Sequence, residues 1–241
     1  MSGHNRWSQI KHQKGAADAK KSKIWTKILR EITMAAKLGG ADPSGNPRLR
    51  KALEDGRLNN LSKEPINRAL AKAAGKEESA NYEELVYEGY GPAGVAVLVS
   101  CLTDNRNRTY AEVRAAFNKN GGNLSTPGSV AFGFQKKGQI LLEKSDNLNL
   151  TEDLILDYGL DAGLEDLAEE PEGFVITCQS ESLLDLKEVL SKHRIQVASA
   201  EIAMLPNNPV ELSEEHSTIL EKIKDSLEDL DDVQKVWTSE A

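Results

Sequence analysis

The sequence predicts an α+β protein of more than one domain, in which a basic helical bundle precedes an α/β domain that carries a second α/β domain as an insertion. Three observations lead to this fold class. The spacing of apolar residues changes from a helical to a strand-like period near residue 80, the net charge changes sign along the chain, and the last helix and strand have no place in the unit before them. We therefore expect domains at 1–80, at 81–135 together with 206–241, and at 136–205.

The first 80 residues predict a bundle of three helices. The first helix follows Asp18 as its expected cap and stops at Gly39-Gly40. We expect a basic arc of this helix to point outward and the opposite, apolar arc to pack inward. The basic arc consists of Lys20, Lys23, Lys27, Arg30 and Lys37, and the apolar arc of Ile24, Trp25, Ile28, Leu29, Ile32, Ala35 and Ala36. Asn46 as cap with Pro47 at the first position predicts a second helix, and a third follows from Ser62.

Residues 81–135 begin the α/β domain. YEELVYEGYG and VAVLVSCLTD are typical of strands, a helix then ends at Gly121-Gly122, and SVAFGF predicts another strand. Gly89, Gly91 and Gly94 fit the spacing G-x-G-x-x-G of dinucleotide-binding loops. That motif must open a helix, whereas a strand follows here, so we expect a tight connection between two strands.

Residues 136–205 show the order strand, helix, strand, strand, helix, strand, in QILLEK, TEDLILDYGL, LEDLAE, GFVITCQ, SLLDLKEVLSKH and QVASAEIAML. This is the order of a ferredoxin-like split βαβ domain. A helix around Ile219–Leu227 and the strand VQKVWT come after it. We expect these two elements to return and complete the domain begun at residue 81, which makes the ferredoxin-like domain an insertion.

Composition and motifs argue against membrane and catalytic classes. In 241 residues, 39% hydrophobic and 28% charged, no apolar run approaches the roughly 18 residues of a membrane span, and the start does not resemble a signal peptide, so a cytoplasmic protein is expected. Cys101 and Cys178 lie in apolar stretches without ligand spacing, and we expect buried, reduced thiols. No phosphate loop, nucleophile elbow or zinc motif occurs. We therefore expect no enzyme, no catalytic residue, no metal and no cofactor.

The distribution of charge is the most informative feature. Residues 1–80 hold 17 Lys and Arg against 8 Asp and Glu, a net charge of +9, whereas residues 141–241 hold 7 against 25, a net charge of −18. Segment 1–30 alone has 8 cations against Asp18. A solvated surface does not require charges of one sign, but neutralising phosphates does. The basic end therefore predicts DNA or RNA as the partner.

Two regions supply the candidate contacts. The first is the basic module, with Trp7 available for base stacking; the second is the loop TDNRNRT, where Asn107 is expected to cap the following helix and the arginines either contact phosphate or simply face solvent. The candidate nucleic-acid-binding residues are His4, Arg6, Trp7, Lys11, His12, Lys14, Lys20, Lys21, Lys23, Lys27, Arg30, Arg48, Arg50, Arg106 and Arg108.

The chain resembles the YebC/PmpR family, which is related to the mitochondrial translational activator of cytochrome oxidase subunit one. The resemblance rests on GHNRWSQIKHQKGAADAKKSKIWTKILREITMAAKLGG, NPRLR, YEGYGPAGVAV, TDNRNRT, NKNGGNL and LEDLDDVQKV, and runs essentially end to end. It implies a helical bundle followed by an α/β domain with an inserted ferredoxin-like domain. This chain has Gln13 where the family commonly has Arg, which removes one cation.

The resemblance implies two non-enzymatic roles. Bacterial members are mostly described as DNA-binding transcriptional regulators, and this is the function we expect. Other members bind messenger RNA or the ribosome and assist translation at proline runs, which is the alternative. The third helix offers only Asn67 and Arg68 for reading bases, so phosphate contacts are expected to dominate in either case.

Overall fold

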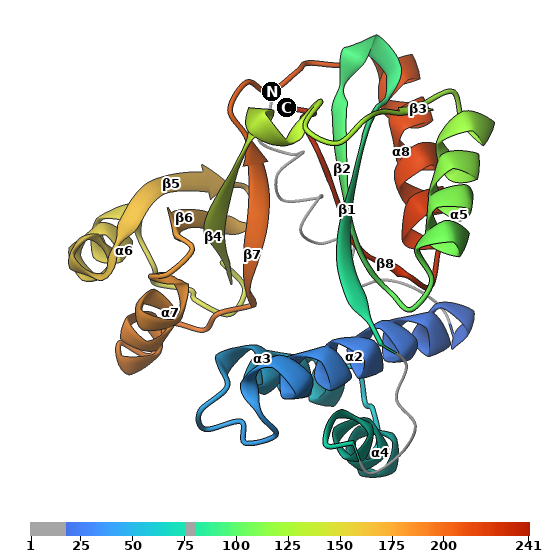
Figure 1. The fold of residues 1–241 in the computed structure, drawn as a ribbon. Helices are drawn as coiled ribbons and strands as arrows, with labels where there is room; N and C mark the ends of the chain where they lie inside the picture. Colours follow the sequence, from blue (N-terminus) through green and yellow to red (C-terminus); the bar gives the residue numbers. More distant parts are fainter. Residues whose placement is uncertain (1–17, 76–80) are drawn as a thin grey trace. The chain divides into compact units, whose positions relative to one another are not determined.

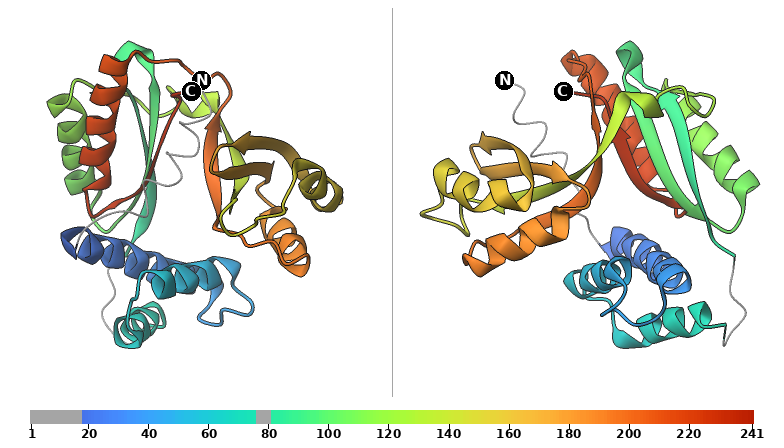
Figure 2. Two further views of the ribbon diagram at one scale, coloured as in Figure 1. Left: turned by 180° about the vertical axis from the view of Figure 1, so that it is seen from behind. Right: turned by 60° about the vertical axis from the view of Figure 1, so that its left-hand side comes forward.

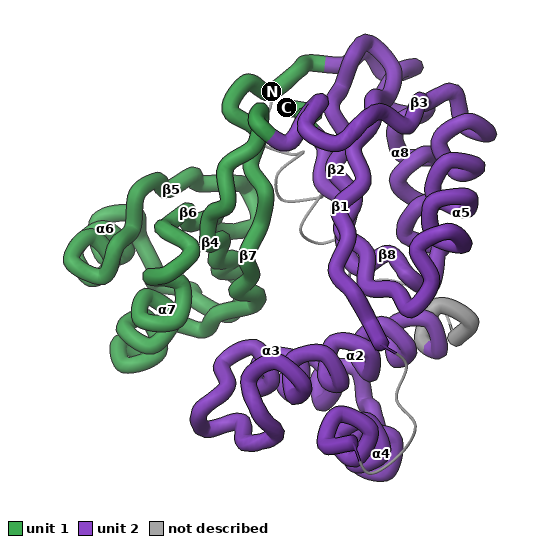
Figure 3. Tube along the Cα trace, in the orientation of Figure 1, with its two compact units in different colours: residues 1–15, 132–211, 239–241 green, residues 16–131, 212–238 purple. Residues whose placement is uncertain are grey.

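The computed structural model describes residues 18–75 and 81–241, which fold into helices and two antiparallel sheets (Figures 1 and 2). Its described residues form two compact units (Figure 3). One contains residues 132–211 and 239–241, and the other contains the described residues of 18–131 and 212–238. The α+β class with N-terminal helices and an inserted domain is confirmed.

The helical part of the larger unit consists of α2 (Asp18–Gly39), α3 (Pro47–Leu58) and α4 (Lys63–Ala73). Ile32, Leu49 and Ala69 lie at the centre of its apolar core. Asn46 joins two of these helices, because its Oδ1 accepts a hydrogen bond from Leu49 N (3.0 Å) at the start of α3 while its Nδ2 donates to Ala35 O (2.8 Å) near the end of α2. The predicted cap is thus confirmed, and it also satisfies a carbonyl at the end of the preceding helix.

The α/β part of the same unit is a four-stranded sheet in the order β3-β1-β2-β8. Its strands are β1 (Glu83–Tyr90), β2 (Ala96–Thr103), β3 (Asn123–Leu124) and β8 (Val233–Thr238), and α5 (Arg106–Lys119) and α8 (Glu214–Glu228) pack beside each other on it (Figure 1). The glycine-rich motif is the tight connection between β1 and β2, where η2 (Pro92–Gly94) lies. β8 pairs with β2, which confirms that the end of the chain returns to this sheet.

Two details of this region differ from the prediction. SVAFGF is not a strand of this sheet, because Ala131–Gly133 form the short helix η3 and Phe134 begins a strand of the other unit. Asn107 is not the cap of α5; Asn105 is, and its side chain accepts from Arg108 N at 3.1 Å. Either asparagine suits a cap by residue type, and only the backbone conformation selects between them.

The smaller unit has the predicted strand and helix order. Its elements are β4 (Phe134–Glu143), α6 (Glu152–Gly159), η4 (Leu160–Ala162), β5 (Leu164–Glu170), β6 (Gly173–Gln179), α7 (Leu183–Lys192) and β7 (Ser199–Pro206), and its sheet order is β5-β6-β4-β7. This is the ferredoxin-like arrangement. Ile140, Phe174 and Leu186 lie in its core between the sheet and the two helices.

A buried carboxylate organises the loop that ends the α/β part before the insertion. Glu88 on β1 is 6% exposed, and its oxygens accept backbone hydrogen bonds from Gly128 (2.6 Å), Val130 (2.7 Å) and Ala131 (2.8 Å). Burial alone would raise the pKa of Glu88, but these N–H groups together outweigh burial and hold the pKa below its ordinary value. The ionised form is therefore the one that stabilises the fold.

We predict that Glu88→Gln lowers the free energy of unfolding at pH 7 by about 1 to 3 kcal/mol, because an amide cannot accept all three hydrogen bonds without turning its N–H₂ group toward a donor. A carboxylate whose pKa is lower in the folded than in the unfolded state stabilises the fold at pH values above its ordinary pKa, roughly 4.3. This contribution disappears as the pH falls through the pKa of the folded state. Urea unfolding between pH 7 and pH 3 should therefore show a smaller loss of stability in the variant than in the wild type. Glu112→Gln, on the exposed face of α5, is the control, and an equal effect of the two substitutions would contradict the role of Glu88.

Candidate nucleic-acid interface

The basic arc of α2 contacts the C-terminal end of α8. Lys23 Nζ donates to Asp229 O (3.0 Å), and Lys27 Nζ donates to Glu228 O (2.6 Å). The C-terminus of a helix carries unsatisfied carbonyls and a partial negative charge, which cations stabilise. α8 has no basic residue in its own last turn. The lysines of α2 supply the missing positive charge.

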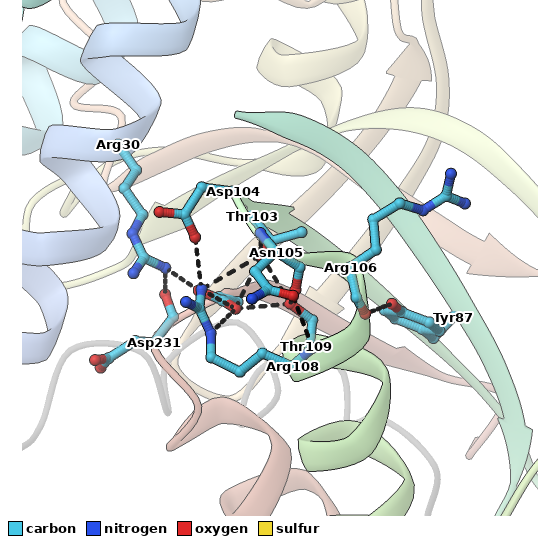
Figure 4. A network of polar contacts seen from close by, with 10 residues as sticks. Arg30, Tyr87, Thr103, Asp104, Asn105, Arg106, Arg108, Thr109 and Asp231 are labelled. Carbon is cyan, nitrogen blue, oxygen red and sulfur yellow. Dashed lines mark hydrogen bonds and ion pairs between the residues drawn. The ribbon is translucent and has the colours of Figure 1, made fainter. Parts of the chain in front are cut away.

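Arg30, one turn further along α2, reaches a buried carboxylate. Its Nη1 donates to Asp231 O (2.6 Å) and to Asp232 Oδ1 (2.5 Å), and the two side chains of the ion pair are only 15% and 2% exposed. Figure 4 shows Arg30 pointing from α2 toward this cluster of polar side chains. The prediction that the basic arc faces outward is therefore wrong for Arg30, because the acidic segment after α8 covers it.

Lys27 is also covered. Burial lowers the pKa of Lys27, and the carboxylates of Glu228, Asp231 and Asp229 only partly offset this effect. Lys23 stays half-exposed beside Asp229, with a 3.2 Å ion pair. The three described cations of the arc that were expected to contact phosphate thus all have partners inside the protein.

Asp232 is the common acceptor of a hydrogen-bond network. Thr109 Oγ1 (2.7 Å), Thr103 Oγ1 (3.0 Å) and Arg108 Nη2 (2.8 Å) all donate to its Oδ2. Burial alone would raise the pKa of Asp232, but these donors and Arg30 together hold it below the ordinary value. Asp232, only 1% exposed, is therefore a buried carboxylate although it lies in an acidic segment of the chain.

The two arginines of the TDNRNRT loop have different surroundings. Arg108 points back to Asp232 and also donates to Asp104 Oδ1 (2.8 Å). Arg106 points away from the network, as Figure 4 shows; its side chain is 67% exposed, with a 3.6 Å ion pair to Glu83. The side chain of Arg108 is 41% exposed in spite of these bonds, so Arg106 is the more exposed of the two and the one without a close ion pair.

The other candidates divide into partnered and undescribed residues. Arg48 donates to both carboxylate oxygens of Glu31 (2.5 and 2.9 Å) and to Glu84. Arg50 donates to Pro43 O (3.1 Å) and Ser44 O (3.0 Å), which fixes the loop before α3. The residues outside the described part of the chain are His4, Arg6, Trp7, Lys11, His12 and Lys14, together with the side chains of Lys20 and Lys21.

The sequence reasoning missed Thr103, Thr109 and Asp232 as a set. The two threonines flank the loop that was singled out, but their carboxylate partner lies 129 and 123 residues further along the chain. No local pattern joins positions so far apart. The only available signal was that DLDD and TDNRNRT both belong to the segments that carry the family resemblance.

The described residues hold no group of three or more His, Cys, Asp and Glu placed to bind a metal ion. Cys101 and Cys178 are free and buried, and burial raises their pKa to about 12 and about 11, which opposes thiolate formation. None of the described helices is both long and apolar enough to cross a membrane.

Comparison with known proteins covers nearly the whole chain. The family profile described as "TACO1/YebC protein N-terminal domain" matches residues 5–76, and the profile described as "TACO1/YebC second and third domain" matches residues 82–239. A "probable transcriptional regulatory protein" of Geobacter sulfurreducens is 47% identical over 239 residues, which are 99% of this chain and 95% of that protein. The "probable transcriptional regulatory protein YebC" of Shigella dysenteriae is 46% identical over 98% of this chain and 95% of its own length.

A solved structure is similar as well. The crystal structure of a conserved hypothetical protein from Aquifex aeolicus superposes with a TM-score of 0.85 at 40% sequence identity, and the match covers 98% of this chain and 96% of that chain. The arrangement of helices and sheets described above is therefore shared with an experimentally determined fold.

We predict that Asp232→Asn lowers the free energy of unfolding by roughly 3 kcal/mol, because removing one partner of a buried ion pair leaves the other charge uncompensated. Asp229→Asn is the matched control, because it breaks an exposed ion pair: the side chain of Asp229 is 61% exposed and that of Lys23 is 40% exposed. This substitution should lower the free energy of unfolding by less than about 1 kcal/mol. Urea titration followed by tryptophan fluorescence, to which Trp25 and Trp237 of the larger unit contribute, measures the difference. Equal losses in the two variants would show that the Asp232 network is not a major contribution to stability.

Proposed function

The chain belongs to the TACO1/YebC family, and we propose that it is a non-enzymatic, DNA-binding transcriptional regulator whose contact with nucleic acid is led by phosphate. The names of the relatives support a regulatory role. The single observation that carries the DNA-binding proposal is the excess of positive charge at one end of an otherwise acidic chain. Such an excess is the usual electrostatic signature of a nucleic-acid partner.

The cations available for this contact are fewer than the sequence implies. Lys23, Lys27, Arg30 and Arg48 have carboxylate or carbonyl partners within the fold. Residues 1–21 nevertheless retain five cations, Arg6, Lys11, Lys14, Lys20 and Lys21, against Asp18 alone. Each phosphate that such a cation neutralises releases condensed counterions, and a handful of these contacts supplies micromolar affinity. We assign the main phosphate contacts to this segment.

Contacts of this kind place a protein on nucleic acid but do not read sequence. In α4, the guanidinium of Arg68 forms an ion pair with Glu64 at 3.2 Å, and Asn67 is the other of the two residues expected to read bases. Specific regulation of a gene then requires further contacts or DNA shape. The alternative function, a ribosome- or messenger-associated translation factor, uses the same phosphate contacts on RNA.

The first test separates these two functions. A transcriptional regulator should bind its own operator at least about a thousandfold more tightly than random duplex at physiological salt. Chromatin immunoprecipitation would locate the operator, and competition binding would measure the ratio. A ratio near one, together with sedimentation of the protein with ribosomes, would overturn the transcriptional proposal in favour of the translation factor.

The second prediction concerns the position of the phosphate contacts. Arg6→Ala combined with Lys11→Ala and Lys14→Ala should reduce the slope of log affinity against log salt by about 2.7 on duplex DNA, because three contacts are lost at about 0.9 each. Lys27→Met should leave the slope unchanged, since Lys27 is already bound to the end of α8. A reduced slope for Lys27→Met would mean that α2 leaves α8 when nucleic acid binds. An unchanged slope for the triple variant would remove the N-terminal segment from the interface.

A further inference from the structure

A hollow of about 420 Å³ lies at the turn between α3 and α4, within the 300 to 1,000 Å³ range of ligand sites. Its apolar lining is Leu53, Leu61 and Ile66, and its polar lining is Arg57, Asn60, Lys63 and Asn67. Asn67 is one of the two residues that the sequence offered for reading bases, whereas Arg57, Asn60 and Lys63 were not among the candidate contacts. Figure 1 shows α3 and α4, which contribute these side chains together with the turn that connects them.

The turn that bounds the hollow is held in place from two sides. Trp25 of α2 donates from Nε1 to Asn59 O (2.8 Å), and Leu61 N donates to Gly56 O (2.8 Å). Leu61 is buried, and Asn60 between them adopts a left-handed conformation with φ +57°. Trp25 is thus used for packing and for anchoring this turn. The backbone of the turn beside the hollow is therefore held by these hydrogen bonds.

The charge of the hollow is positive and uncompensated. Three other cations on α3 and α4 are paired with carboxylates: Arg48 with Glu31 (2.5 Å), Lys51 with Asp55 (3.1 Å) and Arg68 with Glu64 (3.2 Å). Among the described residues no ion pair to Arg57 or Lys63 is found, and no carboxylate lines the hollow. Two exposed cations beside an apolar floor favour a ligand that is both anionic and partly apolar.

We propose that this hollow binds one unpaired nucleotide of the nucleic acid on which the protein acts, an inference that rests on the nucleic-acid binding proposed above. Arg57 and Lys63 hold the phosphate, the base lies on Leu53, Leu61 and Ile66, and the amides of Asn60 and Asn67 hydrogen-bond to the base edge. Amide side chains have the paired donor and acceptor that base edges require. A base that stays paired and stacked in a duplex cannot lay its face on the apolar floor of the hollow. The site therefore selects single-stranded or flipped nucleotides.

The test compares binding of a 12-nucleotide single strand, as DNA and as RNA, with binding of a 12-base-pair duplex to the full chain by fluorescence anisotropy. Arg57→Gln with Lys63→Gln should weaken single-strand binding about twentyfold at 0.1 M salt and reduce the salt slope by about 1.4, since each of two contacts contributes roughly 0.7. Lys51→Gln with Arg68→Gln removes the same charge from the same two helices, but from cations already paired with acids. This control should change affinity less than about threefold.

Asn60→Gly isolates the amide, because glycine keeps the left-handed backbone without strain. It should weaken binding of the single strand and leave the duplex unchanged. Protection from acetylation gives a direct readout: the single strand should protect Lys63 and leave Lys51 reactive. The DNA and RNA arms identify which nucleic acid supplies the nucleotide.

Three results would overturn the inference. If the wild type binds nucleic acid but the two double variants behave alike, the hollow is not the site, and the proposed function stands. If polyglutamate of equal charge protects Lys63 as well as the oligonucleotide does, the hollow is a general anion surface. If the wild type binds neither single strand nor duplex, the proposed function falls together with the inference.

Discussion

The carboxylate of Asp232 is the point on which the larger unit depends. It accepts hydrogen bonds from Thr103 at the end of β2, from Thr109 and Arg108 on α5 and from Arg30 on α2. A buried charge is tolerated only where such partners replace water, so each donor helps to make the position of Asp232 possible. One side chain therefore joins the start, the middle and the end of the chain.

The contacts between α2 and the acidic end of the chain change how the positive charge of residues 1–80 is interpreted. The net charge of +9 in residues 1–80 suggests a continuous basic surface. Lys23, Lys27 and Arg30 are instead directed to carbonyls and carboxylates at the end of α8 and in the segment that follows it. The acidic end of the chain partly neutralises the basic end within one unit. Among the described residues, Arg57 and Lys63 at the turn between α3 and α4 are cations without an ion pair, and the sequence places five further cations in residues 1–21.

Local sequence patterns predicted most of the fold. They did not predict the contacts between residues that lie far apart in the chain. Asn46 with Pro47 marks the start of α3, VQKVWT is β8, and the order of elements after residue 136 gives the ferredoxin-like unit, because each depends on neighbours a few residues apart. The pairing of Arg30 with Asp232 joins residues 202 positions apart. Amphipathicity identifies the polar face of α2, but it cannot distinguish a face turned to solvent from one covered by an acidic segment.

The spacing of Lys23, Lys27 and Arg30 along one side of α2 suits a row of phosphates, and it equally suits the end of α8 with the acidic residues that follow. Competition between these partners is unequal. The internal partner is already in place, whereas binding of a nucleic acid requires loss of translational and rotational freedom. Desolvation of Lys27 and Arg30 has also occurred on folding, and exchanging Asp232 for a phosphate would leave Asp232 buried and short of a donor. We therefore expect the phosphates of a nucleic acid to contact the cations that form no ion pair with a carboxylate of the protein.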